Sequence, residues 1–366
     1  MKEQHGRSGN KSGSKENHMV NQVKAYQQKR HVILMIVFAV WILTVVWSSL
    51  TGIANVNLMR IIATFVSETI FDAAPLTQTE LTVLRDLRLP RIAMGVLAGV
   101  GLSVSGLVMQ AITGNKMASP FTTGISNAAA LGAASVIVFG VVPFGFMQLA
   151  TVVSAFVFAL VCTAVVYGIA GVKGMGKATI ILTGIALNYL FSAMNASLQY
   201  IANEQQLSSI VHWTFGSLSG VDWMEIFIVA IVICAALPYI QRKAWALNLL
   251  STGDESTVAL GVNVRRLRLT GGIIVTLMAA SVVSFCGVIG FVGLVAPHIA
   301  RLLVGGDYRA LIPLSSLLGG ILVVGADTIG RTIASPVVIP VGIVISFIGV
   351  PVFISLILRE KRERLA

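Results

Sequence analysis

One stretch of the sequence comes close to a phosphate-binding loop, in which backbone amides and a lysine hold the phosphates of ATP. Residues 171–178 read Gly-Val-Lys-Gly-Met-Gly-Lys-Ala, which nearly fits G-x-x-x-x-G-K-[ST]. The last position is Ala178, which has no hydroxyl for magnesium, and no soluble nucleotide-binding domain surrounds the loop. We interpret the stretch as a basic turn. If ATP drives this protein, the ATPase is another chain.

Ionisable side chains within apolar runs are a second place to expect chemistry, because ion-coupled carriers bind and release charge there. Of the fifteen acids, only Asp327 lies well inside an apolar run, four residues before Arg331. That spacing allows an ion pair on one helix, so a structural role for Asp327 is at least as well supported as a role in transport. His298, after Pro297, is equally open to a structural or a direct role.

Metal and redox chemistry find no support in the residue spacing. No cluster of His, Cys, Asp or Glu has the spacing of metal ligands. Cys162, Cys234 and Cys286 each stand alone in an apolar segment, as packing residues do. We expect no catalytic site, no metal site and no cofactor in this chain.

The main polar interruption of the second half is residues 249–262, followed by three arginines. Thr252 and Glu255 have the spacing of a capping box, and acids at 254 and 255 favour a helix start. Gly261 stands where a glycine would end the helix after about two turns. The sequence predicts a short exposed helix near 252–261, which is either an ordinary loop helix or a segment on which a second protein acts.

The composition excludes a soluble protein. The chain has 366 residues, of which 56% are hydrophobic and 11% charged, and a mean hydropathy of +0.87. Uncharged runs such as 33–50 and 332–358 are long enough to span a bilayer as helices, and the alternating pattern of a membrane barrel is not seen. The sequence predicts an all-α polytopic membrane protein with no nucleic-acid partner. We expect no cleaved signal peptide, because the first apolar run begins late and has the length of a full span.

Ten spans are predicted, in a transmembrane domain of residues 33–358. The seventh and eighth share few residues, so we expect one of them to be short or re-entrant and covered by its neighbours. The spans are residues 33–53, 90–111, 121–142, 147–170, 178–201, 223–240, 269–288, 289–304, 311–330 and 337–358.

The positive charges predict the orientation. With ten spans, 21 of the Lys and Arg residues fall on the side of the two chain ends, and five fall on the other side. Basic loops face the cytoplasm, so both termini are expected there. Residues 1–32 are too polar to bury a core and are predicted to be a disordered basic tail, and residues 359–366 are a second basic tail.

Three arginines on the predicted outer side are unusual there. Arg88 and Arg91 flank Leu89-Pro90 at the start of the second span, and Arg331 follows the ninth. Forked guanidinium groups bind carboxylates well, so these side chains are candidates for docking an acidic partner. Anchoring at the membrane surface is the alternative.

These residues, with several further motifs, resemble the permease subunit of the ABC importers for ferric siderophores, haem and vitamin B12, the type II or FecCD-like family. The resemblance covers about residues 35–358. The matching pieces are Arg88-Leu89-Pro90-Arg91, residues 105–110, residues 114–120, residues 213–218, Leu260-Gly261-Val262, residues 290–298, Gly306-Asp307-Tyr308-Arg309, Ala326-Asp327 and Pro340-Val341-Gly342.

The resemblance implies a vitamin B12 importer permease-like fold with ten helices, in the bacterial cytoplasmic membrane. It also implies a second permease subunit, identical or paralogous, two cytoplasmic ATPases that bind ATP and Mg²⁺, and an extracytoplasmic binding protein. The implied coupling residues are Gly253, Asp254, Glu255, Ala259, Leu260 and Gly261. The implied docking residues are Arg88, Arg91 and Arg331.

The chain departs from the family pattern at two places. Val338 stands where Glu is usual before Pro-x-Gly, which puts the partner of Arg331 in question. Lys116-Met117 replaces the usual Pro-Leu after Asn115, which leaves the details of that turn open.

The expected function is inward passage of an iron chelate, with a ferric siderophore as the first candidate and haem or cobalamin as the alternatives. A secondary carrier that works without ATP is disfavoured by the scarcity of charge within the spans. A structural membrane protein with no transported substrate is disfavoured by the ordered family motifs.

Overall fold

The computed structural model describes residues 6–51, 76–142 and 145–363, and in these ranges every regular element is a helix. Ten apolar helices lie at the ten predicted positions. They are α1 (Gly6–Leu50), α5 (Leu89–Thr113), α6 (Ile125–Phe139), α7 (Met147–Val172), α8 (Lys177–Ile201), α10 (Trp223–Arg242), α13 (Val264–Cys286), α14 (Val292–Val304), α15 (Tyr308–Gly330) and α16 (Val341–Glu363). Among the described residues, seven helices are long and apolar enough to cross a membrane, and α6, α14 and residues 341–355 of α16 are shorter apolar helices. The all-α polytopic fold is thus confirmed.

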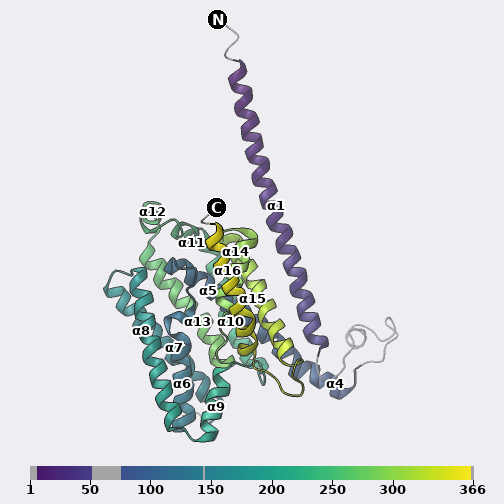
Figure 1. Cartoon of the computed structure of the whole chain (residues 1–366), viewed down its shortest axis with the longest axis vertical. Helices are drawn as coiled ribbons and strands as arrows, with labels where there is room; N and C mark the ends of the chain where they lie inside the picture. The colour runs from purple at the N-terminus through teal and green to yellow at the C-terminus, as the bar shows by residue number, and fades with distance from the viewer. Residues whose placement is uncertain (1–5, 52–75, 143–144, 364–366) are drawn as a thin grey trace.

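Short helices connect the long ones. They are α4 (Gln78–Thr82), the π-helical turn η1 (Val83–Arg88), the 3₁₀ turn η2 (Pro120–Thr123), α9 (Glu204–Thr214), α11 (Ala244–Leu250) and α12 (Asp254–Ala259). Figure 1 shows α12, the start of α1 and the end of α16 toward one end of the bundle, and α4 and α9 toward the other. We call these the α12 end and the α9 end. The start of α1 and the end of α16 thus lie toward the same end of the bundle.

Helix α5 is the centre of the bundle and packs against α15, α13, α14 and α10. Small residues allow the backbones to touch. A Cβ atom on Gly99 would collide with the backbone of Gly319, and one on Gly106 would collide with Gly293. Van der Waals contact at this range holds helices together in lipid, because apolar side chains gain little free energy by moving from apolar lipid into a helix interface.

Helix α14 is the short element that the sequence predicted between the seventh and ninth spans. Its 13 residues rise about 20 Å, which is less than the ~30 Å of a bilayer core. Residues 287–291 connect it to α13 without a regular helix, and Phe291 has a left-handed φ of 62°. The loop after α9 and the start of α16 cover this connection: Gly216 and Gly342 both lie against the carbonyl of Val288.

Helix α1 differs from the prediction at its start. It begins at Gly6, so most of the segment predicted as a disordered tail continues the first span as helix. Once a span has formed, each further residue adds one hydrogen bond without the cost of nucleation. Figure 1 shows this part of α1 projecting beyond the α12 end. Further along, α1 packs along α15, where the Trp41 ring lies against Gly320.

Candidate coupling and docking surfaces

Helix α12 is the short polar helix predicted near 252–261, but its cap differs from the prediction. The N-cap is Gly253, with a φ of 118° and no side-chain cap. The Thr252 hydroxyl instead donates to the carbonyl of Leu249 at 2.7 Å, so the predicted capping box is wrong. The Thr252 hydroxyl is therefore bound at the end of α11, and no side-chain oxygen caps the free amides at the start of α12.

The C-terminal stop of α12 is confirmed. The amide of Gly261 bonds the carbonyl of Val258, and the amide of Val262 bonds that of Thr257. This pair of bonds is the Schellman motif, and Gly261 has the positive φ of 82° that the motif requires. Hydrogen bonds within the segment therefore end the helix at Gly261, without a contact from a partner protein.

One face of α12 is exposed and partly apolar. Val258 is 60% exposed and Leu260 is 57% exposed, and Glu255 and Ala259 are exposed beside them. The opposite face is fixed, because the buried Thr257 hydroxyl lies 2.8 Å from the carbonyl of Leu249. The predicted coupling residues thus lie together on one protruding segment, with two apolar side chains uncovered in the chain alone.

Asp254 turns away from this exposed face and anchors the segment to the bundle. Its carboxylate lies 2.8 Å from the Arg268 guanidinium and 3.1 Å from the Lys177 amine. Arg268 is buried and also donates to the carbonyls of Ile112 and Met175. Met175 and Lys177 belong to the turn that resembles a phosphate-binding loop, so that turn holds α12 in place.

The Asp254 anchor is formed at neutral pH. Partial burial acts to raise the pKa of Asp254, but hydrogen bonds from Arg268 and Lys177 outweigh it and hold the pKa below the usual 3.8. A carboxyl whose pKa is lowered by folding stabilises the fold above its ordinary pKa and loses that effect as the pH falls through the lowered value. The Asp254 carboxyl is therefore ionised at neutral pH, as the ion pair requires.

Replacing Arg268 by Met is expected to destabilise the protein by about 2–3 kcal/mol, because two buried carbonyls lose their charged donor. Amide hydrogen exchange in residues 254–259 should also become faster, since Asp254 loses its buried partner. Arg265→Met is the matched control, because Arg265 is exposed and reaches only the Gly171 carbonyl at 3.3 Å. Equal exchange in the two variants would show that Arg268 does not anchor α12.

A second polar cluster joins the first helix to the same end of the bundle. Asp307 caps α15 and accepts hydrogen bonds from Arg30 of α1 at 3.0 Å and from Asn248 of α11 at 2.8 Å. Burial acts to raise the pKa of Asp307, and the bonds from Asn248, the Arg309 amide and Arg30 lower it overall. The sequence motif at 306–309 therefore joins α1 and α15 to α11, the helix before α12.

The three predicted docking arginines lie close together at the α9 end, but they bind groups of their own chain. Arg91 forms a forked pair with Asp327, with contacts of 2.7 to 2.9 Å. Arg331 lies 3.7 Å from Asp327 and also donates to the hydroxyl and carbonyl of Ser48. Arg88 is 5% exposed and donates to the carbonyl of Ser49.

Asp327 thus has the structural partner that its spacing predicted, and a closer one in Arg91 that the spacing did not. Arg331 donates to Ser48 and pairs with Asp327, so that side chain has partners although Val338 replaces the usual Glu. Side-chain exposure is 15% for Arg91 and 9% for Arg331, so both guanidinium groups are mostly buried and do not protrude from the surface. Docking through them stays a prediction.

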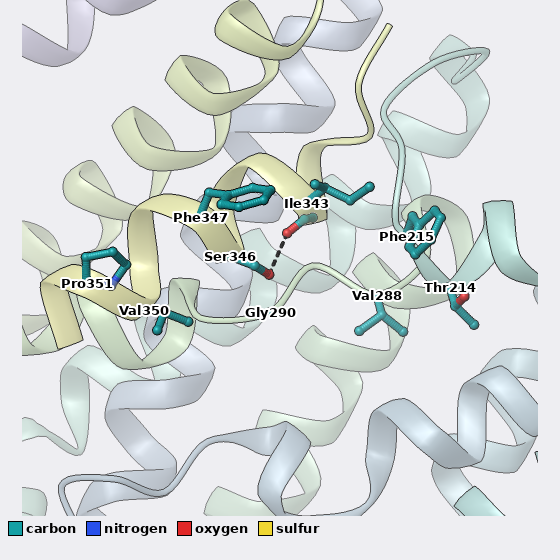
Figure 2. A pocket seen from close by; sticks show the side chains of 10 residues that line it. Thr214, Phe215, Val288, Gly290, Ile343, Ser346, Phe347, Val350 and Pro351 are labelled. Carbon is teal, nitrogen blue, oxygen red and sulfur yellow. Dashed lines mark hydrogen bonds between the residues drawn. The ribbon is translucent and has the colours of Figure 1, made fainter. Parts of the chain in front are cut away.

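An apolar cavity of about 620 Å³ lies where the end of α9, the α13–α14 connection and the first half of α16 meet (Figure 2). Its only hydroxyls are those of Thr214 and Ser346, and the Ser346 hydroxyl donates to the carbonyl of Gly342. Phe347 is 78% exposed at its edge. None of the lining residues is charged; they are Thr214, Phe215, Val288, Gly290, Gly342, Ile343, Ser346, Phe347, Val350 and Pro351.

Comparison with known proteins identifies close relatives. The model of the FecCD transport family matches residues 37–359. A protein named "Putative ABC transporter permease protein" from Methanocaldococcus jannaschii is 42% identical over 293 residues, which cover 77% of this chain and 83% of that one. The hemin transport system permease protein of Yersinia pestis is 36% identical over 283 residues, which cover 76% of this chain and 84% of that one.

The fold also matches a solved structure over nearly its whole length. That structure is described as "an inward-facing conformation of a putative metal-chelate type ABC transporter". The match has a TM-score of 0.79 at 28% sequence identity and covers 89% of this chain and 99% of that one. The helical arrangement is therefore the one found in that transporter.

Proposed function

The chain belongs to the FecCD transport family of ABC importer permeases, and from that premise we propose that it carries a ferric siderophore inward across the plasma membrane. The chain itself is a non-catalytic membrane subunit. The substrate is the part that we infer: relatives are named for hemin, cobalamin, ferric citrate and ferric hydroxamates, and most of these are iron chelates.

The observation that carries the mechanism is the rigid, exposed helix α12. We propose that it seats in a groove of a cytoplasmic ATPase, with Val258 and Leu260 as the apolar contacts and Glu255 beside them. Because Asp254 ties α12 to buried Arg268, a push on α12 is passed directly to α13 and to the end of α5. Two ATPases, which bind the ATP and Mg²⁺, would act on two permease subunits in this way.

The uncharged cavity of Figure 2 supports a large, weakly held substrate. We propose that it forms part of the wall of a pathway between two permease subunits. A chelate that encloses its iron offers no metal to protein ligands, and a wall without charges lets it pass without tight binding. The metal then travels as cargo inside its carrier.

We also propose that an extracytoplasmic binding protein docks at the α9 end. Arg88, Arg91 and Arg331 hold the start of α5 and the end of α15 together there through Asp327, Ser48 and Ser49. Next to them, residues 332–338 are exposed and offer the contact surface.

The test is uptake of radiolabelled iron by cells that lack this chain, supplied in turn with hydroxamate, catecholate and citrate chelates, haem, and labelled cobalamin. We expect the loss of one ferric siderophore class and its return when the gene is restored. Loss of haem or cobalamin uptake alone would move the substrate to that class. Uptake that continues after ATP is depleted would favour a secondary carrier and contradict the proposal.

A further inference from the structure

A second cavity, of about 490 Å³, lies at the α12 end between the last turn of α10, helix α11 and the first turn of α13. Apart from Gly261, which is also one of the predicted coupling residues, the proposed transport function does not use this cavity. Its walls carry three cations and no acid. The lining residues that matter here are Tyr239, Arg242, Lys243, Trp245, Arg266 and Thr270.

Within the described residues, no carboxylate forms an ion pair with the three cations. In the described ranges, Arg30, Arg91, Lys177, Arg268 and Arg331 form ion pairs with carboxylates, whereas Arg242, Lys243 and Arg266 form none. Lys243 lies over the ring of Tyr239 at 5.8 Å. Asn263, the N-cap of the 23-residue helix α13, lines the same cavity, so the positive end of that helix lies beside it. This concentration of positive charge favours the binding of an anionic ligand.

The surface that continues from the cavity is apolar and helical. On α13, Arg266 and Thr270 line the cavity, and the exposed Ile273 follows one turn later on the same face. On α10, Arg242 and Tyr239 line it, and the exposed Ile231 lies two turns before Tyr239 on the same face. This arrangement matches a phospholipid. The cationic cavity can take the anionic headgroup, and the two apolar helix faces can take the acyl chains.

Aromatic side chains mark the depth of the cavity. Trp245 is 48% exposed and Tyr239 is 36% exposed, and both line the cavity. Trp and Tyr gather at the level of the lipid headgroups, because their rings are apolar and their N–H or O–H groups are polar. Basic cavities between spans on the cytoplasmic side suit anionic headgroups.

We propose that this cavity binds the headgroup of an anionic phospholipid such as phosphatidylglycerol, with its acyl chains along α10 and α13. Helix α11 forms part of the cavity and continues through 251–253 into α12. A bound lipid would therefore support α11, which leads into α12, the helix that we propose contacts the ATPase. The site depends on membrane insertion and not on transport, so it can stand if the proposed substrate is wrong.

The test is native mass spectrometry of the purified full chain with phosphatidylglycerol and phosphatidylcholine of equal chain length. We expect wild type to retain phosphatidylglycerol preferentially. In Arg242→Gln/Lys243→Gln/Arg266→Gln the preference should fall at least about 10-fold, and in Arg266→Gln alone by a smaller factor. The matched control is Lys173→Gln/Arg265→Gln/Arg309→Gln, which removes three exposed charges from the same end and should keep the preference.

Three outcomes would overturn the site. Equal losses in the two triple variants would mean that net charge alone attracts the lipid. Displacement of phosphatidylglycerol by millimolar inorganic phosphate would mean that the cavity takes free phosphate. Loss of the lipid when the chain is purified with its ATPase subunits would assign the cavity to a protein interface.

Discussion

Replacing Val258 and Leu260 together by Asp is expected to abolish substrate uptake while the protein still inserts and folds. Val258 on α12 and Leu260 at its C-cap are both more than half exposed, so the folded chain loses little packing. In a complex, buried apolar anchors of this kind contribute about 2 kcal/mol each, and a carboxylate in their place would be desolvated. Copurification of the ATPase should fall by at least roughly 30-fold, measured at equal amounts of permease.

The matched control for this experiment is Val172→Asp. Val172 ends α7, is 89% exposed, and precedes the Met175 carbonyl and the Lys177 amine, the two groups of the 171–178 turn that bind Arg268 and Asp254. It adds the same kind of charge to the same end without touching α12, so uptake and copurification should stay near wild type. If the α12 variant still bound its ATPase and transported normally, α12 would not be the point of coupling.

Asp327→Ala is expected to cause a large loss of stability, about 3–5 kcal/mol, because it removes the carboxylate shared by Arg91 and Arg331. Asp327 is 3% exposed, and both guanidinium groups are mostly buried, so neither regains full hydration. The measurement is the midpoint of thermal unfolding in mild detergent. Binding-protein docking should weaken too, because residues 332–338 follow Arg331 directly.

Two further variants separate this effect from a general loss of charge. Asp86→Ala removes an exposed carboxylate at the same end and should leave the midpoint within a degree or two of wild type. Asp327→Leu combined with Arg91→Leu should be more stable than Asp327→Leu alone, since one unpaired charge is removed with its partner. If Asp327→Ala unfolded like Asp86→Ala, the arginine cluster would have no structural role.

The membrane fold could be predicted from the sequence, because an apolar chain in lipid must satisfy its backbone hydrogen bonds internally and few structures do so. Every predicted span contains a helix, and the short eighth helix followed from the few residues left for two crossings. Helix α9 was not predicted, since 11 residues are too few for a span. Its start carried a readable signal, the capping box that Asn203 forms with Gln206.

The contacts that matter for function were harder to predict, because they join distant residues. Arg91 and Asp327 are 236 positions apart, whereas the spacing of Asp327 and Arg331 revealed only the longer contact of the two. Asp254 was assigned to the partner-facing surface with Glu255, yet it points at Arg268 and Lys177. Local pattern predicts that a helix exists and where it ends, but not which side faces the bundle when only six residues are helical.

The brevity of α14 accounts for the existence of the cavity in Figure 2. A helix spanning the ~30 Å hydrocarbon core would need about two more turns than the 13 residues of α14 supply. Those turns would occupy the volume next to Val288 and Gly290, which instead line the open space. Lengthening α14 would thus fill the cavity, because the cavity lies where the missing turns of a full-length helix would be. Smaller side chains on a full-length helix would not leave the same space.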